Sequence, residues 1–169
     1  MSFLLSLEKE KFMETRIVAT PYEIERKKPM PSKNHSFIQS NLIFLLQLHY
    51  RNKYRIASEL SLDLMGWESV PDLCIYAPMP MDLLHDEIEL KEPPLAVIEI
   101  ISPTQSLQEL VNKAEKYFRS GVQSCWLVLP AVKNIYVFST PTNYHIFNAD
   151  ETLIDDCLAI SLPLAEAFA

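Results

Sequence analysis

The architecture of this chain can be predicted from one apolar stretch near its middle, Leu95-Ala-Val-Ile-Glu-Ile-Ile101. Its side chains are apolar at even and odd positions alike, apart from Glu99. A strand with this pattern is typically covered on both faces of a sheet, since successive side chains point to opposite faces. The stretch therefore predicts a central strand with other elements packed above and below it.

Two helices are predicted to provide this cover. Residues 34–50 place apolar side chains at helical spacing, and either Ser32 or Asn34 can cap the start. Residues 105–120 carry one apolar stripe and end before Gly121, which can supply the left-handed conformation of a helix stop. The two helices lie on opposite sides of the central strand in the sequence.

The other patterned segments are predicted strands, at residues 20–26, 55–63, 70–76, 124–129, 133–139 and 143–148. A loop at 78–94 contains four prolines and five acids, and residues 158–168 form a final segment. The order of helices and strands predicts an α/β (α+β) fold, a single domain with a mixed sheet flanked by helices. We expect this domain at 20–169, after an N-terminal extension or short helix at 1–19.

The composition limits the functions that this chain can have. The sequence has 169 residues and a net charge of −7, which taken alone argues against a dedicated nucleic-acid binder. Its two glycines cannot form a glycine-rich phosphate loop. The three cysteines form no CxxC pair and are expected to be free thiols in a reducing compartment. No apolar run reaches the ~20 residues of a membrane span, so we expect a cytoplasmic protein with no membrane partner.

The charge is distributed unevenly along the chain. No Asp or Glu occurs between Arg26 and Arg55, and this stretch carries seven basic side chains. It either neutralises the acidic remainder of the protein or forms a surface for a polyanion.

Two carboxylates stand out because their neighbours are apolar. Glu99 is the one charged residue of its strand, and Asp72 directly precedes the apolar residues Leu73 to Tyr76. Burying a lone carboxylate costs several kcal/mol unless it is paired, protonated or bound to a metal. If loop 78–94 joins these strands as neighbours, the two carboxylates meet on one face, and Mg²⁺ or Mn²⁺ would relieve their repulsion.

Lys113 is the best candidate for a cation beside these acids. On a helical wheel it lies at the border of the apolar stripe of helix 105–120, so its ammonium group can reach inward toward Glu99. The alternative is a buried Glu99–Lys113 ion pair with a purely structural role in an acidic interaction protein.

These residues resemble a known family over nearly the whole chain, from about residue 20 to 168. Asp72 and Glu99, together with their neighbouring residues, resemble the sequence motif of the PD-(D/E)xK superfamily, which has the restriction-endonuclease-like fold. The chain is more specifically similar to the Uma-type endonucleases, long known as a bacterial domain of unknown function that is common in cyanobacteria. The matching residues are Tyr22-Glu23, Pro29-Met30-Pro31, His35, Val70-Pro71-Asp72, Glu99 through Thr104, Lys113, Tyr117, Gly121-Val122 and Cys125 through Pro130.

The resemblance implies a metal-dependent nuclease that hydrolyses phosphodiester bonds, with Asp72 and Glu99 holding one or two Mg²⁺ or Mn²⁺ ions. It implies Lys113 and Glu23 as further catalytic residues. The superfamily lysine, two residues after the second acid, is replaced here by Ile101, and Lys113 would take its role. Glu25 and Glu59 are the alternatives to Glu23 as the third acid.

The resemblance also implies a nucleic-acid partner, with DNA favoured over RNA. The basic stretch would hold the phosphate backbone through a set of polar residues, Lys27, Lys28, Lys33, His35 and Gln39. For His35, a hydrogen-bonded role on the surface is the competing interpretation. Cutting both strands of a duplex would favour a homodimer. The alternative function is a non-catalytic module that binds nucleic acid or protein and keeps a relic of the nuclease site.

Overall fold

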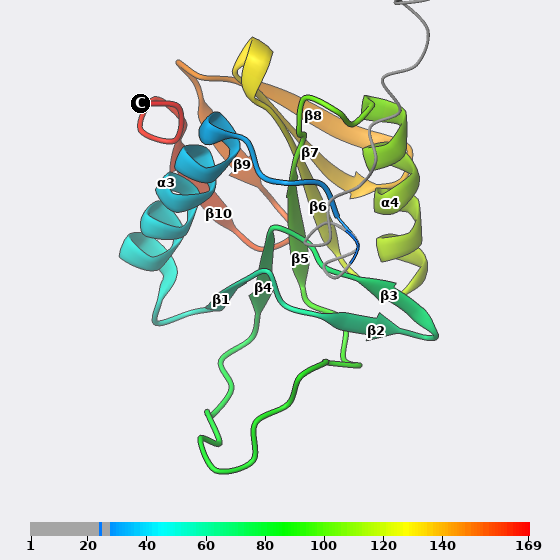
Figure 1. Ribbon diagram of the computed structural model, residues 1–169. Helices are drawn as coiled ribbons and strands as arrows, with labels where there is room; N and C mark the ends of the chain where they lie inside the picture. The colour runs from blue at the N-terminus through cyan, green and yellow to red at the C-terminus, as the bar shows by residue number, and fades with distance from the viewer. Residues whose placement is uncertain (1–23, 25–27) are drawn as a thin grey trace, which may run out of the picture.

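The computed structural model describes Ile24 and residues 28–169 of the chain (Figure 1). The N-terminal extension or short helix expected at 1–19 lies outside the described residues, as does most of the strand expected at 20–26. Ile24, the one described residue of that segment, has a helical backbone. Among the helices of the described part, none combines the length and the apolar character needed to cross a membrane.

Within the described residues, six strands form one mixed sheet in the order β1-β4-β5-β6-β7-β8. Their bounds are Arg55–Ser58, Leu73–Tyr76, Ala96–Ile100, Ser124–Leu129, Asn134–Thr140 and Asn143–Asn148. Strands β5 and β6 run parallel, and the other neighbouring pairs run antiparallel. The stretch 95–101 thus contains an interior strand, β5, which is buried at every position. The predicted mixed sheet is confirmed.

Helix α3 (Lys33–Tyr50) and helix α4 (Leu107–Arg119) cover opposite faces of this sheet (Figure 1). The buried residues of α3 pack with Ile98, Ile100 and other side chains of one face. Those of α4 pack with Val97, Leu127 and other side chains of the opposite face. The alternation of side chains along β5 therefore explains why its sequence is apolar at every position but one.

The ends of both helices follow from local sequence. The Ser32 side chain accepts a hydrogen bond from the His35 amide at 3.3 Å, which confirms the first of the two predicted caps. Ser106 and Glu109 form a capping box at the start of α4. Gly121 ends that helix with a φ of +102°.

Two hairpins depart from the expected strand pattern. The strand predicted at 55–63 is broken, because Glu59 has a left-handed backbone with a φ of +54°. The chain continues as a separate hairpin, β2 (Leu62–Leu64) with β3 (Trp67–Ser69), which packs on the α4 side. The final segment holds β10 (Ile160–Pro163), paired with an unpredicted strand, β9 (Thr152–Asp155), on the α3 side.

Candidate functional site

The two predicted acids lie on neighbouring parts of the sheet. Asp72 directly precedes β4, and Glu99 lies in β5. The antiparallel register pairs Leu73 with Ile98, so Asp72 stands opposite Glu99 one step further along the strands. Both acids are buried, with exposures of 1% and 3%. The loop at 78–94 therefore joins adjacent strands and leaves both acids at the same rim of the sheet.

Glu99 is held by two side chains of α4. The Nζ of Lys113 lies 2.6 Å from Glu99 Oε1, and the Tyr117 hydroxyl donates a hydrogen bond to the same oxygen at 2.7 Å. The Tyr117 hydroxyl is also 2.6 Å from the Ser69 hydroxyl. Burial, followed by the charge of Glu99, raises the pKa of Tyr117 well above its usual value, so this phenol stays a neutral donor. Lys113 therefore reaches inward, as its position on the helical wheel predicts.

Asp72 is held by a different set of partners. Its Oδ2 accepts a hydrogen bond from the Ile100 amide at 2.6 Å, and its Oδ1 lies 2.5 Å from Lys28 Nζ and 3.2 Å from His35 Nε2. Burial alone would raise the pKa of Asp72, but the nearby His35 ring and the charge of Lys28 outweigh it and lower the pKa. Asp72 is therefore a carboxylate at neutral pH, as a metal ligand must be.

His35 and Gln39 do not lie where an exposed groove would place them. His35 is 2% exposed, so the expectation of a surface histidine is wrong. Gln39 donates hydrogen bonds to Glu59 Oε1 at 3.2 Å and to the Asp72 carbonyl at 3.1 Å. The first turns of α3 thus place His35 and Gln39 beside Asp72, and their contact with nucleic acid stays a prediction.

The described residues contain one close group of ligand atoms, contributed by His35, Glu59 and Asp72, all within 4.8 Å of one another. Of the candidates for the third acid, Glu59 is therefore the one that the described structure places near Asp72. Glu99 does not belong to this group and lies beside Lys113. That Asp72 and Glu99 share one ion stays a prediction. Three predicted residues, Glu23, Glu25 and Lys27, lie outside the described part of the chain.

The basic stretch does not form one continuous surface. Lys28 is inside the acid cluster, and Lys33 is exposed at the start of α3. The remaining described bases, Arg51, Lys53 and Arg55, follow the other end of this helix. An 18-residue helix separates the two groups by about 27 Å. That both groups contact one nucleic acid stays a prediction.

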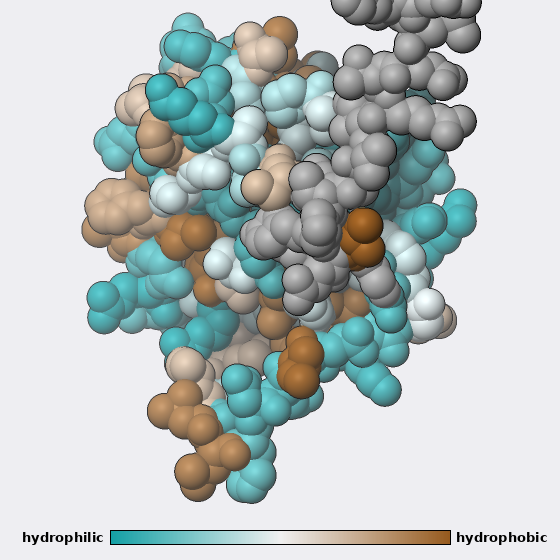
Figure 2. All heavy atoms as spheres, viewed as in Figure 1, coloured by the Kyte–Doolittle hydropathy of each residue, from teal (hydrophilic) through white to brown (hydrophobic). Residues whose placement is uncertain are grey.

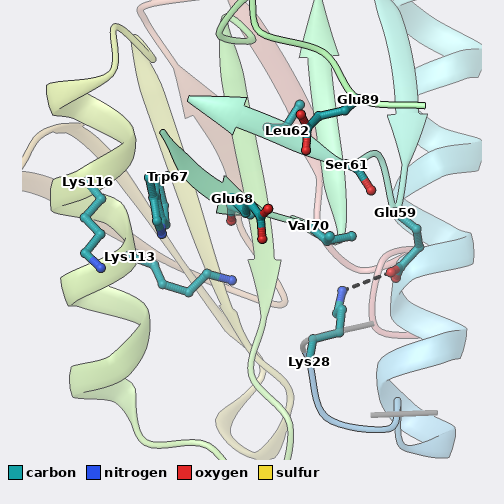
Figure 3. Close-up of a pocket in the computed structure, with 11 residues that line it drawn as sticks. Lys28, Glu59, Ser61, Leu62, Trp67, Glu68, Val70, Glu89, Lys113 and Lys116 are labelled. Atoms are coloured by element: carbon teal, nitrogen blue, oxygen red, sulfur yellow. Dashed lines mark hydrogen bonds and ion pairs between the residues drawn. The ribbon is translucent and has the colours of Figure 1, made fainter. Parts of the chain in front are cut away.

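A pocket of about 570 Å³ opens beside the acids. Figure 3 shows Lys113 pointing from α4 toward its middle, with the Lys28–Glu59 ion pair on the opposite wall. Trp67 lines the same pocket, and Lys116 Nζ lies 5.3 Å from the centre of its ring. Trp67 lies in a hairpin that the sequence pattern did not predict. Three lysines and three glutamates, Glu68 and Glu89 among them, line this pocket, so its wall carries both signs of charge.

Comparison with known proteins agrees with this architecture. No curated protein matches the chain in sequence. Among solved structures, one described as a putative nuclease belonging to DUF820, from Anabaena variabilis, matches with a TM-score of 0.72 and 23% identity, covering 83% of each chain. A likeness at this identity shows the fold, which confirms the predicted class. The sequence model of the Uma2 family, described as "Putative restriction endonuclease", matches residues 21–165. Because this match spans most of the chain, the protein belongs to the Uma2 family.

Proposed function

We propose that this protein is a metal-dependent nuclease that hydrolyses phosphodiester bonds of nucleic acid, with DNA as the preferred substrate. The family and the fold support a nuclease. The observation that carries the proposal is the position of Lys113, whose ammonium group lies 2.6 Å from the buried carboxylate of Glu99 at the edge of an open pocket. Asp72 begins the neighbouring strand at the same rim.

The residues of this rim fit a divalent ion. Buried carboxylates are hard oxygen ligands that suit Mg²⁺ or Mn²⁺. A buried ring nitrogen, His35 Nε2, lies 3.2 Å from the Asp72 carboxylate and has no hydrogen-bond partner among the described residues. Asp72 and Glu99 would hold the ion, with Glu23 as a third acid outside the described part. When bound, such an ion polarises the phosphate and lowers the pKa of a water molecule.

The chain's own residues would supply the rest of the chemistry. Lys113 can turn from Glu99 to a phosphate oxygen and stabilise the negative charge that develops on it. Tyr117 keeps the Glu99 carboxylate in place during this change, because it is buried and donates to the same oxygen. Lys27 and Lys33 would contact the backbone of the nucleic acid, and Lys28 would join them once it leaves the carboxylates of Asp72 and Glu59.

A second copy of the chain is the proposed protein partner, since cleavage of both strands of a duplex requires two sites. The proposed location is the cytoplasm. The three cysteines are free, and Cys74 and Cys125 are buried, which supports a reducing compartment.

Substitution of Lys113 by Met tests the catalytic role. Lys113→Met should keep the fold and metal binding but lower the rate of phosphodiester hydrolysis by ~10²–10³, the usual effect of losing a preorganised donor. The assay compares single-stranded DNA, duplex DNA and RNA with Mn²⁺ and after chelation. Lys91→Met, which removes an exposed lysine outside the site, is the matched control. Equal activity of wild type and Lys113→Met would remove Lys113 from the mechanism.

The alternative function is a binding module with a relic site. The observation in its favour is Ile101, which occupies the position of the superfamily lysine. Wild-type protein that binds nucleic acid but cleaves none of the three substrates would support this alternative over the nuclease.

A further inference from the structure

Lys28 lies between the acids of the site and not on the surface. Its side chain is 13% exposed, and Nζ is 2.5 Å from Asp72 Oδ1 and 3.0 Å from Glu59 Oε2. Two carboxylates this close to one point would repel each other without a positive charge between them. The ammonium group therefore stands in for a small cation, and its nitrogen marks where such a cation would contact both acids.

His35 faces the same point from α3. Its Nε2 lies 3.2 Å from Asp72 Oδ1 but makes no hydrogen bond to any described residue, although the side chain is 3% exposed. The other ring nitrogen, Nδ1, lies 3.5 Å from the Ser102 hydroxyl. A buried histidine held on one nitrogen, whose other nitrogen lies beside a carboxylate oxygen without a hydrogen bond, has a nitrogen available as a metal ligand.

The spacing of these groups fits one ion. A ligand atom from each of His35, Glu59 and Asp72 lies within 4.8 Å of the others. An octahedral ion with bonds of about 2.1 Å places neighbouring ligands ~3 Å apart and opposite ligands ~4.2 Å apart. Small side-chain movements would therefore close the three groups around an ion at the position of the lysine nitrogen.

We propose that His35, Glu59 and Asp72 form a divalent-cation site distinct from the pairing of Asp72 with Glu99, and that Lys28 fills this site until an ion displaces it. The inference rests on the proposed function because the two sites share Asp72. It requires neither Glu99 nor Lys113. One imidazole nitrogen beside carboxylates suits Mn²⁺ better than Mg²⁺, which prefers an all-oxygen shell. Ion binding is thereby linked to withdrawal of Lys28 from the acids.

The first measurement is the affinity for Mn²⁺, by calorimetry and by electron paramagnetic resonance, on wild type, Lys28→Met and Lys91→Met. Lys28→Met should bind Mn²⁺ at least ~10-fold more tightly, because one competing charge has been removed from a partly buried site. Lys91→Met removes an equal charge from the exposed loop and should bind like wild type. Unchanged or weaker binding by Lys28→Met would overturn the proposal.

The second measurement identifies the ligands, and its deciding spectrum is that of the wild type. Pulsed electron paramagnetic resonance of bound Mn²⁺ should show coupling to a ¹⁴N nucleus, which His35→Gln abolishes and Glu99→Gln leaves in place. An active nuclease whose bound Mn²⁺ lacks this coupling would overturn the proposal and leave the nuclease function intact. A protein without nuclease activity whose Mn²⁺ signal carries the coupling would support the proposal and overturn the proposed function instead.

Discussion

The hydroxyl of Tyr117 joins Glu99 of β5 to Ser69 of β3. It donates to Glu99 Oε1 at 2.7 Å and lies 2.6 Å from the Ser69 hydroxyl, and the whole side chain is buried. Its ring also contacts Trp67, with ring centroids 4.9 Å apart. When a buried carboxylate loses one of its hydrogen-bond donors, water does not replace the lost bond. The folded state is then destabilised by most of the desolvation free energy of that carboxylate oxygen.

Replacement of Tyr117 by Phe therefore has a defined cost. Tyr117→Phe should lower the free energy of unfolding by about 1–3 kcal/mol, since the ring still packs but Glu99 keeps, within the described part of the chain, only Lys113 as a partner. Urea denaturation followed by circular dichroism measures the change. Tyr144→Phe, at a half-exposed ring, is the control and should stay within about 0.5 kcal/mol of wild type. A similar loss in both variants would mean that the bond to Glu99 contributes nothing.

Individual residues differ in how well the sequence predicts them. Glu99 and Asp72 could be identified because a charge within an apolar strand requires a partner. Lys113 could be identified because helical periodicity fixes the direction of its side chain. The burial of His35 could not be predicted, because it depends on how the start of α3 packs across the rim. The position of Glu59 beside Asp72 depends on a left-handed backbone at Glu59, and the residue pattern does not predict that conformation.

At the scale of elements, the end of α4 determines where its side chains lie over the sheet. The Gly121 amide donates to the Phe118 carbonyl, and the Val122 amide donates to the Tyr117 carbonyl, as in a Schellman motif. This motif requires the φ of +102° at Gly121, which residues with a side chain rarely adopt. A Cβ there would meet Pro93 at 3.4 Å, an ordinary contact, so the obstacle is backbone strain.

Gly121→Ala should consequently lower the free energy of unfolding by about 1–2 kcal/mol, the usual cost of forcing a left-handed conformation on alanine. Thermal unfolding and urea titration measure this change. Arg119→Ala, in the last turn of the same helix and 77% exposed at the side chain, should change stability by less than about 0.5 kcal/mol. A Gly121→Ala protein as stable as wild type would show that the helix can end without this motif.

Helices and long strands could be predicted because their periodicity extends over many residues. The segment at 55–63 could not, since its apolar pattern continues across the left-handed Glu59 and does not distinguish one strand from two. Strand β9 was missed for a related reason. Its four residues alternate between exposed and buried positions over too short a span to give a pattern.

At the scale of the whole molecule, two surfaces suggest how copies would associate. Loop 77–95 projects from the body of the protein at the bottom of Figure 1, and Figure 2 shows brown, apolar atoms at the same place. Leu83, Leu84 and Ile88 are 81%, 90% and 92% exposed, among acidic neighbours. A groove at the end of α3 has the opposite charge, and it is lined by Phe44, Leu48, Arg51, Arg55 and Pro78 among others.

These surfaces are complementary in charge and both are partly apolar, so the loop of one copy can occupy the groove of another. A reciprocal exchange gives a closed two-fold dimer. We expect wild-type protein to be a dimer at micromolar concentrations by size-exclusion chromatography with light scattering. Leu84→Ser combined with Ile88→Ser should make it a monomer with an unchanged circular dichroism spectrum. Met65→Ser, at an equally exposed position on the β2–β3 hairpin, should remain a dimer.

Variants with reversed charges distinguish this interface from any other mode of association. Arg51→Glu should weaken the dimer by repelling the acidic loop, and Asp86→Lys with Glu87→Lys should weaken it by repelling the basic groove. Mixing these two monomeric variants should restore a dimer, because each reversed surface then meets its complement on the other copy. A dimer that survives all of these changes would place the contact elsewhere, and a wild-type monomer would exclude the homodimer altogether.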